Sequence, residues 1–273
     1  MTACIFKYKT QAMRRLLNLA GQGYVHHTSG VVSLEKTDRL HHRFAELYDT
    51  ELGDDRRYRS FKRGECKTQS VMYYCASDRV VRWWLVCSDG SGAIHDKELL
   101  SDARDKHHRL AFAAPAKYYS EGSSPPRYEM VRHRIRDKKT GKTKNPWTWK
   151  YDSESYNNLF DCFAEEIAGV RYVDGEFKRD KLLVSMLDSL RRTPGFHESR
   201  RQAIRLHAHA RKVWKKRQSL DWPYPAGDFK YWVGQYQKEV KCTAAYFIRR
   251  EESFAGIRKI DPVDYVTPGA IVT

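Results

Sequence analysis

Adjacent histidines are the side chains in this sequence best suited to acid-base chemistry. Two such pairs, His26-His27 and His41-His42, lie in the first fifty residues, and Arg43 directly follows the second pair. Metal-independent RNA cleavage needs a base for the 2′-hydroxyl proton, an acid for the leaving oxygen and a cation for the charge that develops on the phosphate. Histidine titrates near neutral pH and arginine stays charged, so these residues are candidates for a catalytic site.

Two other interpretations of the histidines stay open. They could be ordinary core or surface residues, or they could bind a metal, but neither pair has a Glu or Cys partner at a spacing that a metal site requires. Cys4, Cys66, Cys75, Cys87, Cys162 and Cys242 are scattered without a C-x-x-C pair, which argues against a zinc ribbon. The sequence also lacks complete Walker A and dinucleotide-binding motifs. We therefore expect no metal and no cofactor.

Two histidines separated by one residue, His207 and His209, imitate the His-hydrophobic-His motif of rolling-circle nucleases. That motif belongs on a strand, whereas this pair lies in a strong helical pattern. Tyr231 and Tyr236 also lack the lysine that follows the catalytic tyrosine four residues later in that motif. A relaxase-like function is therefore a minor alternative.

Residues 128–151 predict a basic β-hairpin. Alternation places three arginines on one face of its first strand, while tryptophans alternate along the second strand. Guanidinium groups pair with phosphates and indole rings stack on bases, so we expect this hairpin to contact nucleic acid. The candidate contact residues are Arg132, Arg134, Arg136, Lys138, Lys139, Lys142, Lys144, Trp147 and Trp149.

Two further basic segments are candidates for phosphate contact. Residues 197–218 have the spacing of a helix with one apolar stripe, and no acidic residue lies between Arg200 and Arg217. A helix that only faces water usually mixes both signs of charge, so this helix is expected to face a polyanion. The candidates in the two segments are Arg56, Arg57, Arg59, Lys62 and Arg63, and Arg200, Arg201, Arg205, Arg211, Lys212, Lys215, Lys216 and Arg217.

The elements that must position these side chains predict an α+β fold. Residues 1–151 are rich in strand and turn signals, with a hairpin over 68–90 and helices over 11–21, 38–52 and 95–110. Residues 152–273 are mainly helical, with helices over 155–169, 178–192 and 197–218. No low-complexity linker separates the two regions, so we expect them to pack together.

Composition supports a polyanion as the partner. The chain has 50 Lys and Arg against 34 Asp and Glu, a formal net charge of +16, and 41% hydrophobic residues typical of a globular protein. We expect nucleic acid as the partner, RNA rather than DNA because stacking aromatics are plentiful and no groove-reading motif is present. The sequence has no long apolar run and no signal-peptide pattern, so a cytoplasmic protein with no membrane partner is expected.

The opening strand-helix-strand pattern, the basic charge, the length, and the His, Tyr and Arg of the first fifty residues resemble Cas6-like CRISPR RNA endoribonucleases of the plasmid-borne type IV branch. The resemblance covers mainly residues 1–90. It implies a ferredoxin-like βαββαβ unit that grips a repeat hairpin, cleaves it without metal and keeps the product within an effector complex. The glycine-rich loop of that family is absent, and 251-EESFAGIRK-259 stands in its place.

Two functions are therefore expected to compete. The first is an endoribonuclease that processes a structured, CRISPR-repeat-like RNA and retains the product, with other subunits of a ribonucleoprotein complex as further partners. The second is a non-catalytic nucleic-acid-binding subunit of a plasmid or other mobile element, acting in replication, transfer or effector assembly. A metal-dependent DNA nuclease is a third alternative. The charge alone does not separate them, because all three use the same basic surfaces.

Overall fold

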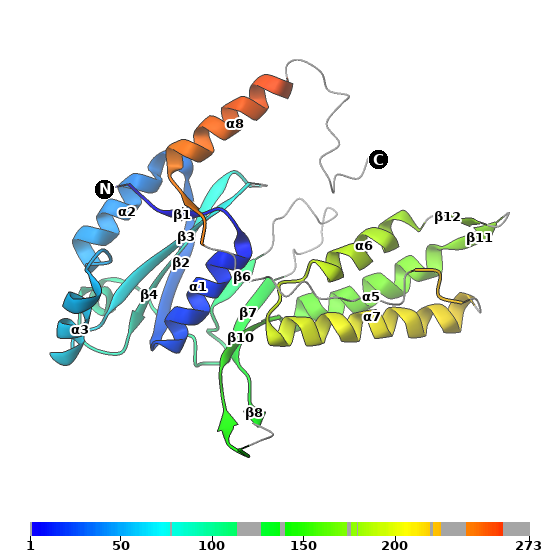
Figure 1. Cartoon of the computed structure of the whole chain (residues 1–273), viewed down its shortest axis with the longest axis horizontal. Helices are drawn as coiled ribbons and strands as arrows, with labels where there is room; N and C mark the ends of the chain where they lie inside the picture. The colour runs from blue at the N-terminus through cyan, green and yellow to red at the C-terminus, as the bar shows by residue number, and fades with distance from the viewer. Residues whose placement is uncertain are drawn as a thin grey trace.

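The computed structural model describes residues 2–76, 78–113, 127–136, 140–173, 176–178, 180–218, 221–224 and 239–258. It confirms an α+β fold, with a mixed sheet in the N-terminal half and helices in the C-terminal half (Figure 1).

The main sheet has six strands in the order β13-β1-β3-β4-β2-β5. Only β1 and β3 run parallel, and all other neighbours are antiparallel. The predicted hairpin over 68–90 is confirmed as β3 and β4, which form the centre of the sheet. The strands are β1 (Ile5–Phe6), β2 (Tyr24–Ser33), β3 (Thr68–Cys75), β4 (Val80–Ser88), β5 (Ser101–Asp102) and β13 (Lys241–Cys242).

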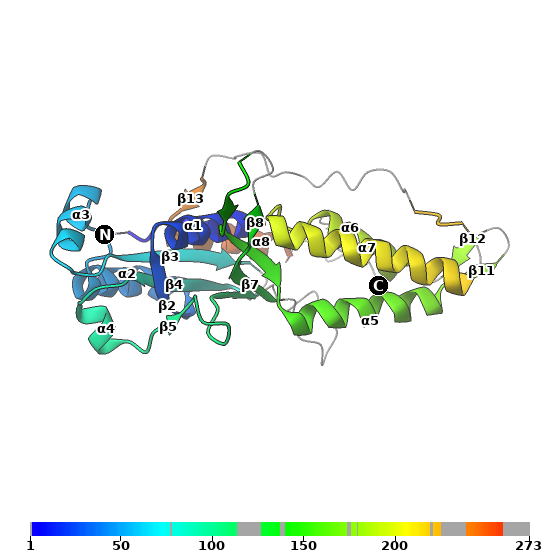
Figure 2. The same ribbon diagram turned by 90° about the horizontal axis from the view of Figure 1, so that it is seen from below.

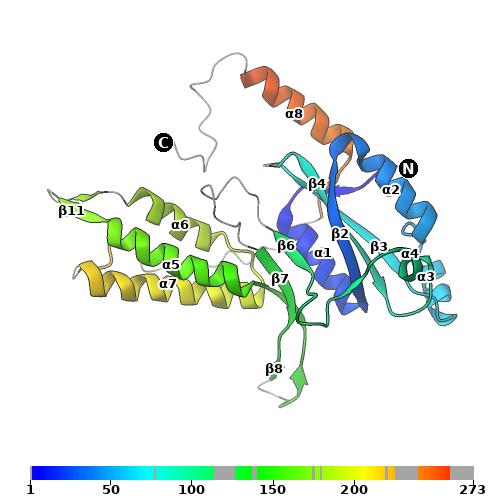
Figure 3. The same ribbon diagram turned by 180° about the vertical axis from the view of Figure 1, so that it is seen from behind.

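Helices cover both faces of this sheet. α1 (Lys9–Gly21) packs on one face through Ala12, Leu16 and neighbouring apolar residues. α2 (Leu34–Tyr48) covers the other face, where α8 (Ala244–Arg258) packs against it (Figure 3). Along the chain, the short helix α3 (Asp54–Lys62) follows α2, and the short helix α4 (Ala93–Lys97) follows β4.

The prediction of a helix over residues 95–110 is wrong. α4 ends at Lys97, and β5 then pairs with β2, so that His26 lies opposite Asp102. The Asp102 carboxylate accepts a hydrogen bond from the backbone N–H of Arg104 at 2.8 Å. Aspartate binds nearby backbone N–H groups in turns, and here such a turn replaces the predicted helix.

A second sheet packs against α1 and also touches the main sheet, where Phe112 of the second sheet stacks on Trp84 of β4. It has the order β10-β7-β6, and its strands are β6 (Ala111–Ala113), β7 (Arg127–Arg132) and β10 (Trp147–Tyr151). One apolar core joins α1 to both sheets, through residues such as Leu16, Trp84, Phe112 and Met130. The second sheet therefore holds β7 and β10 rigidly at the middle of the molecule.

Beyond this sheet, β7 and β10 continue into a protruding hairpin with the strands β8 (Ile135–Arg136) and β9 (Thr143–Lys144) (Figure 1). The backbone N–H of His133 donates to the carbonyl of Pro146 at 2.9 Å and closes its base. The predicted hairpin over 128–151 is thus confirmed, with Trp147 opposite Arg132. We call residues 132–136 and 140–147 the arm. Lys138 and Lys139 lie outside the described residues.

The C-terminal helices form a bundle with its own core. α5 (Ser153–Gly169), α6 (Lys181–Arg191) and α7 (His197–Gln218) bury apolar stripes against one another, and β11 (Arg171–Val173) and β12 (Glu176–Lys178) close the far end (Figure 2). The Gln202 amide both donates to the carbonyl of Tyr151 and accepts from its N–H, so α7 is fixed to β10. None of the described helices has the length and apolar character that a membrane crossing requires.

The βαββαβ order implied by the resemblance is not followed in the chain. Two helices, α2 and α3, separate β2 from β3, and the β3–β4 hairpin lies between β1 and β2 in the sheet. The physical reason is the length of the connection after β2. It is long enough for α2 to cover one face of the sheet before the chain returns as a central strand.

Candidate nucleic-acid interface

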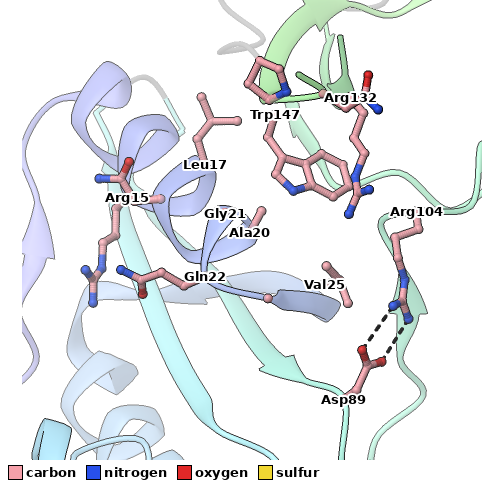
Figure 4. Close-up of a pocket in the computed structure, with 14 residues that line it drawn as sticks. Arg15, Leu17, Ala20, Gly21, Gln22, Val25, Asp89, Arg104, Arg132 and Trp147 are labelled. Carbon is pink, nitrogen blue, oxygen red and sulfur yellow. Dashed lines mark hydrogen bonds and ion pairs between the residues drawn. The ribbon is translucent and has the colours of Figure 1, made fainter. Parts of the chain in front are cut away.

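A groove of about 840 Å³ lies between the C-terminal end of α1 and the base of the arm (Figure 4). Its lining includes Arg15, Asn18 and Gln22 from α1 and the following turn, Asp89 and Arg104 on the opposite wall, and Arg132, Asn145 and Trp147 from the arm. We call it the arm groove. It combines several positive side chains, amide groups and one indole ring, which are the groups that bind phosphates and bases.

Trp147 supplies the aromatic surface of the arm groove. Its ring is only partly buried, and the Arg132 guanidinium lies 4.8 Å from the ring centroid. The two residues are opposite each other on β7 and β10, so the strand register produces this stacking. An indole with a guanidinium beside it can take a base on its free surface while the charge meets a phosphate.

Trp149 does not share this role, and its predicted contact with nucleic acid is wrong. Its side chain is fully buried, and the indole N–H donates to the backbone carbonyl of Met13 at 3.0 Å. The two-residue period puts both tryptophans on one face of β10, but α1 covers that face only at Trp149. Tertiary packing therefore buries Trp149 and leaves Trp147 partly exposed, although the sequence pattern predicts the same exposure for both.

The arm keeps its predicted positive charges in solvent. Arg132, Arg134 and Arg136 are exposed, whereas His133 and Ile135 between them are half-buried, as the alternation predicted. Lys142 and Lys144 on the returning strand are exposed as well. The arm is therefore a two-stranded projection with cationic side chains on both strands.

The opposite wall of the arm groove is a network of charges. Arg104 donates to both oxygens of Asp102, and to Asp89 at 3.0 and 3.1 Å. His26 Nε2 lies 2.7 Å from Asp89 Oδ1 and 3.4 Å from the Arg104 guanidinium. The hydrogen bond from Arg104, followed by that from His26, holds the pKa of Asp89 below its usual range. This network fixes Arg104 at the rim of the groove.

Of the five candidate catalytic residues, the structure brings only His26 next to the arm groove. His26 lies opposite Cys87, on the sheet face that α2 covers, and its imidazole reaches Asp89 and Arg104, whereas His27 lies opposite Val86 and faces the core beneath α1. The His27 Nε2–H donates to the carbonyl of His108 at 2.9 Å, and burial lowers the pKa of His27. His27 is thus a neutral, hydrogen-bonded core residue, and its predicted catalytic role is wrong.

The other three candidates lie on α2, on the sheet face away from α1. His41 is buried with its Nε2 3.8 Å from Glu51, and exposed His42 pairs with Glu46 one turn later. Arg43 is exposed on the same helix. Their closeness to His26 in the sequence does not become closeness to the arm groove, so the structure does not assemble the five residues into one site.

The shorter basic segment that the sequence predicted to contact phosphate corresponds to α3 and the residue after it. The positive charges of Arg57 and Arg15 both act on the Tyr24 phenol, although burial is the larger effect and raises its pKa. Arg56, Arg59 and Lys62 are exposed. Arg57 and Arg63 instead bind within the protein: Arg57 to Asp54 and the carbonyl of Thr50, and Arg63 to Glu65. Three of the five candidates in this segment are therefore exposed to solvent.

α7 has the bounds predicted from the sequence, and its charges are segregated. Ala203, Leu206, Ala210 and Trp214 form the buried stripe. At about 100° per residue, seven of the eight basic residues fall within an arc of about 160° opposite that stripe, and only Arg217 lies outside it. The seven are Arg200, Arg201, Arg205, Arg211, Lys212, Lys215 and Lys216. The helix begins beside the arm, where His133 lies 2.9 Å from Glu198, so the two basic surfaces are neighbours.

Two residues of the arm groove were missed by sequence reasoning. Arg15 lies on an amphipathic helix that predicts only packing, and Arg104 lies in a segment with a predicted helix. No motif marks either residue. Only the fold places them opposite the arm.

If the arm groove binds single-stranded RNA, Trp147→Ala should weaken that binding while leaving the fold intact. A base stacked on an aromatic ring contributes about 1–3 kcal/mol, so the dissociation constant should rise about 5- to 150-fold. Trp147→Phe, which keeps an aromatic ring, should lose less. Fluorescence anisotropy with a labelled oligonucleotide measures both variants. Equal affinity of the alanine variant and the wild type would contradict the stacking role.

Cys66 is a second feature that the sequence did not single out. It is half-buried beside Cys87, and a hydrogen bond from the Cys87 thiol stabilises the Cys66 thiolate and lowers its pKa to about 6. Between pH 7 and pH 5 its rate of alkylation by iodoacetamide should therefore fall about tenfold as the thiolate is lost. Cys162 is more exposed, but burial and nearby carboxylates raise its pKa, so it should react more slowly at pH 7. Peptide mass spectrometry would measure both rates, and faster labelling of Cys162 would contradict the assignment.

Comparisons with known proteins give no match to a family model, a curated protein or a solved structure. The resemblance to Cas6-like endoribonucleases therefore stays a hypothesis.

Proposed function

We propose that this protein binds RNA and holds a single-stranded segment in the arm groove, with the flanking backbone along the arm and α7. The observation that carries the proposal is the pairing of the partly exposed Trp147 ring with Arg132 inside a groove that Arg15 and Arg104 also line. An aromatic platform with a guanidinium group beside it binds a base and its phosphate together.

Single-stranded RNA fits this surface better than a duplex. In a duplex the base faces are stacked on one another, whereas a single strand can offer an unstacked base to Trp147. The exposed charges of the arm and of α7 belong to two neighbouring elements that meet at His133 and Glu198. A flexible strand can follow both elements from the groove.

Direct binding measurements test this proposal. Labelled single-stranded RNA, single-stranded DNA of the same sequence, and RNA and DNA duplexes are titrated with the full chain at several salt concentrations. We expect the tightest binding to single-stranded RNA and an affinity that falls steeply with salt, since phosphate contacts release counterions. Tightest binding to duplex DNA, or a salt-independent affinity, would overturn the proposal.

Endoribonuclease activity is a second candidate function, favoured by the position of His26. Its imidazole lies at the rim of the arm groove, held by Asp89 and next to Arg104. In metal-independent cleavage, His26 would accept or donate the proton, Asp89 would hold the ring, and Arg104 would stabilise the charge that develops on the phosphate.

Cleavage of the RNA that binds most tightly, assayed with a chelator present, separates this candidate from a non-catalytic binding subunit. For an enzyme, His26→Ala should lower the cleavage rate about 10²- to 10⁴-fold with binding retained. His42→Ala, an exposed α2 histidine that pairs with Glu46 rather than with Asp89 or Arg104, should cleave like the wild type. If the wild-type protein does not cleave the RNA, the protein is a non-catalytic binding subunit. Cleavage that the chelator abolishes would indicate a metal-dependent nuclease.

A further inference from the structure

Two histidines and a glutamate converge where the arm meets α7. His133 directly follows β7, and His197 and Glu198 form the first turn of α7. The Nδ1 atoms of His133 and His197 lie 2.9 and 3.1 Å from the same oxygen, Oε1 of Glu198. The two imidazole rings are 4.5 Å apart, and one ligand atom from each residue lies within 4.8 Å of the other two.

Hydrogen bonds alone account poorly for this arrangement. Oε1 of Glu198 also lies 2.9 Å from a guanidinium nitrogen of Arg201, so three donors meet at one oxygen. A carboxylate oxygen has two lone pairs, which leaves one donor more than it can bind well. A cation between the imidazoles and the carboxylate would remove this excess.

The geometry points to a binding site for a divalent transition-metal ion of the Zn²⁺ type, formed by His133, His197 and Glu198. Two imidazole nitrogens and one carboxylate oxygen are a ligand set that zinc uses in proteins, with a fourth position left open. Bonds of about 2.0–2.2 Å in a tetrahedron separate the ligand atoms by about 3.4 Å, so the observed contacts need to open by only a few tenths of an ångström.

Such an ion would connect the arm to α7 and fix the angle between them. The Glu198 side chain is 16% exposed, and that of His133 is 19% exposed, whereas His197 is 48% exposed, so the site opens to solvent on the His197 side. A water molecule or a phosphate oxygen could take the fourth position. The metal site itself is argued from ligand geometry and does not depend on the proposed RNA binding.

Arg201 gives an independent prediction. Its positive charge next to Glu198 opposes a bound cation, and its side chain is 44% exposed and free to turn into solvent. Arg201→Ala should therefore bind the metal more tightly than the wild type, an effect that a purely structural ion pair between Arg201 and Glu198 would not produce.

The test uses the full chain, stripped with a chelator, dialysed and titrated with Zn²⁺ against a chromophoric chelator. We expect a site for which His133→Ala and His197→Ala weaken binding at least about tenfold, with His107→Ala, an exposed histidine elsewhere, as the matched control. His197 is half-exposed, so its variant should remain folded, which circular dichroism checks.

Co²⁺ substitution distinguishes this site from the cysteines. A spectrum without thiolate charge-transfer bands, altered by His197→Ala, is the expected result. Thiolate bands that persist in His197→Ala, or Zn²⁺ affinity unchanged in both histidine variants, would overturn the inference. Neither result would bear on RNA binding by the arm groove.

Discussion

Replacing Arg132, Arg134 and Arg136 together with alanine is expected to weaken single-stranded RNA binding about 100-fold at 0.1 M salt. Each phosphate contact with a single strand contributes about 0.7 to the slope of log affinity against log salt, so losing three lowers the slope by about 2. All three side chains are exposed, and the replacement should leave the fold unchanged. The measurement is fluorescence anisotropy over a series of salt concentrations.

The matched control removes the same charge from another surface. Lys36, Arg39 and Lys97 are exposed on α2 and α4, on the other side of the main sheet. Their triple alanine variant has the same net charge as the arm variant, and we expect it to bind within about threefold of the wild type and to keep nearly the same slope, because exposed charges farther away than about 10 Å are largely screened at 0.1 M salt. Equal losses in both variants would mean that net charge alone drives binding.

Trp149→Ala is expected to lower the free energy of unfolding by about 3–5 kcal/mol, the usual cost of truncating a buried tryptophan. The ring is fully buried between α1 and the two sheets, packs edge-to-face on Phe112 with centroids 6.0 Å apart, and donates to the carbonyl of Met13. This loss is a large share of the 5–15 kcal/mol that holds typical domains together.

Urea unfolding followed by circular dichroism measures this loss, with Trp147→Ala as the comparison. Trp147 is partly exposed, so its replacement should cost about 1 kcal/mol or less in stability while it weakens RNA binding. The two neighbouring tryptophans should therefore have opposite profiles. A stability loss below about 1 kcal/mol for Trp149→Ala would contradict its place in the core.

Local sequence patterns predicted the helices and hairpins whose own residues follow a regular helical or strand period. The bounds of α7 agree with the structure because its apolar residues follow the helical period over the whole of residues 197–218. The hairpins at 68–90 and 128–151 were predicted because strand formers flank turn residues. The exposed arginines of the arm follow from the same alternation.

The arm groove could not be predicted in this way. Its walls come from α1, from the turn after β4, from the segment after β5 and from the arm, which only the packing of two sheets on α1 brings together. The same packing buries Trp149 and leaves Trp147 partly exposed, a difference that a two-residue period does not contain. The helix expected over 95–110 failed because β5 pairs with β2 across a long sequence separation.

The sequence also could not show which histidines the fold brings together. Adjacent residues on a strand face opposite sides, so His26 and His27 were never able to act in one site. His133 and His197, which the sequence did not connect, converge on Glu198 because β7 and α7 both pack beside β10.

Photocrosslinking is the most direct test of RNA binding by the arm groove. The protein is bound to single-stranded RNA containing 4-thiouridine, irradiated and digested, and the crosslinked peptides are identified by mass spectrometry. We expect crosslinks at Trp147 and in the arm, with others along the basic face of α7. Crosslinks confined to α2 and α8, on the opposite face of the main sheet, would contradict the assignment of the arm groove as the RNA-binding site.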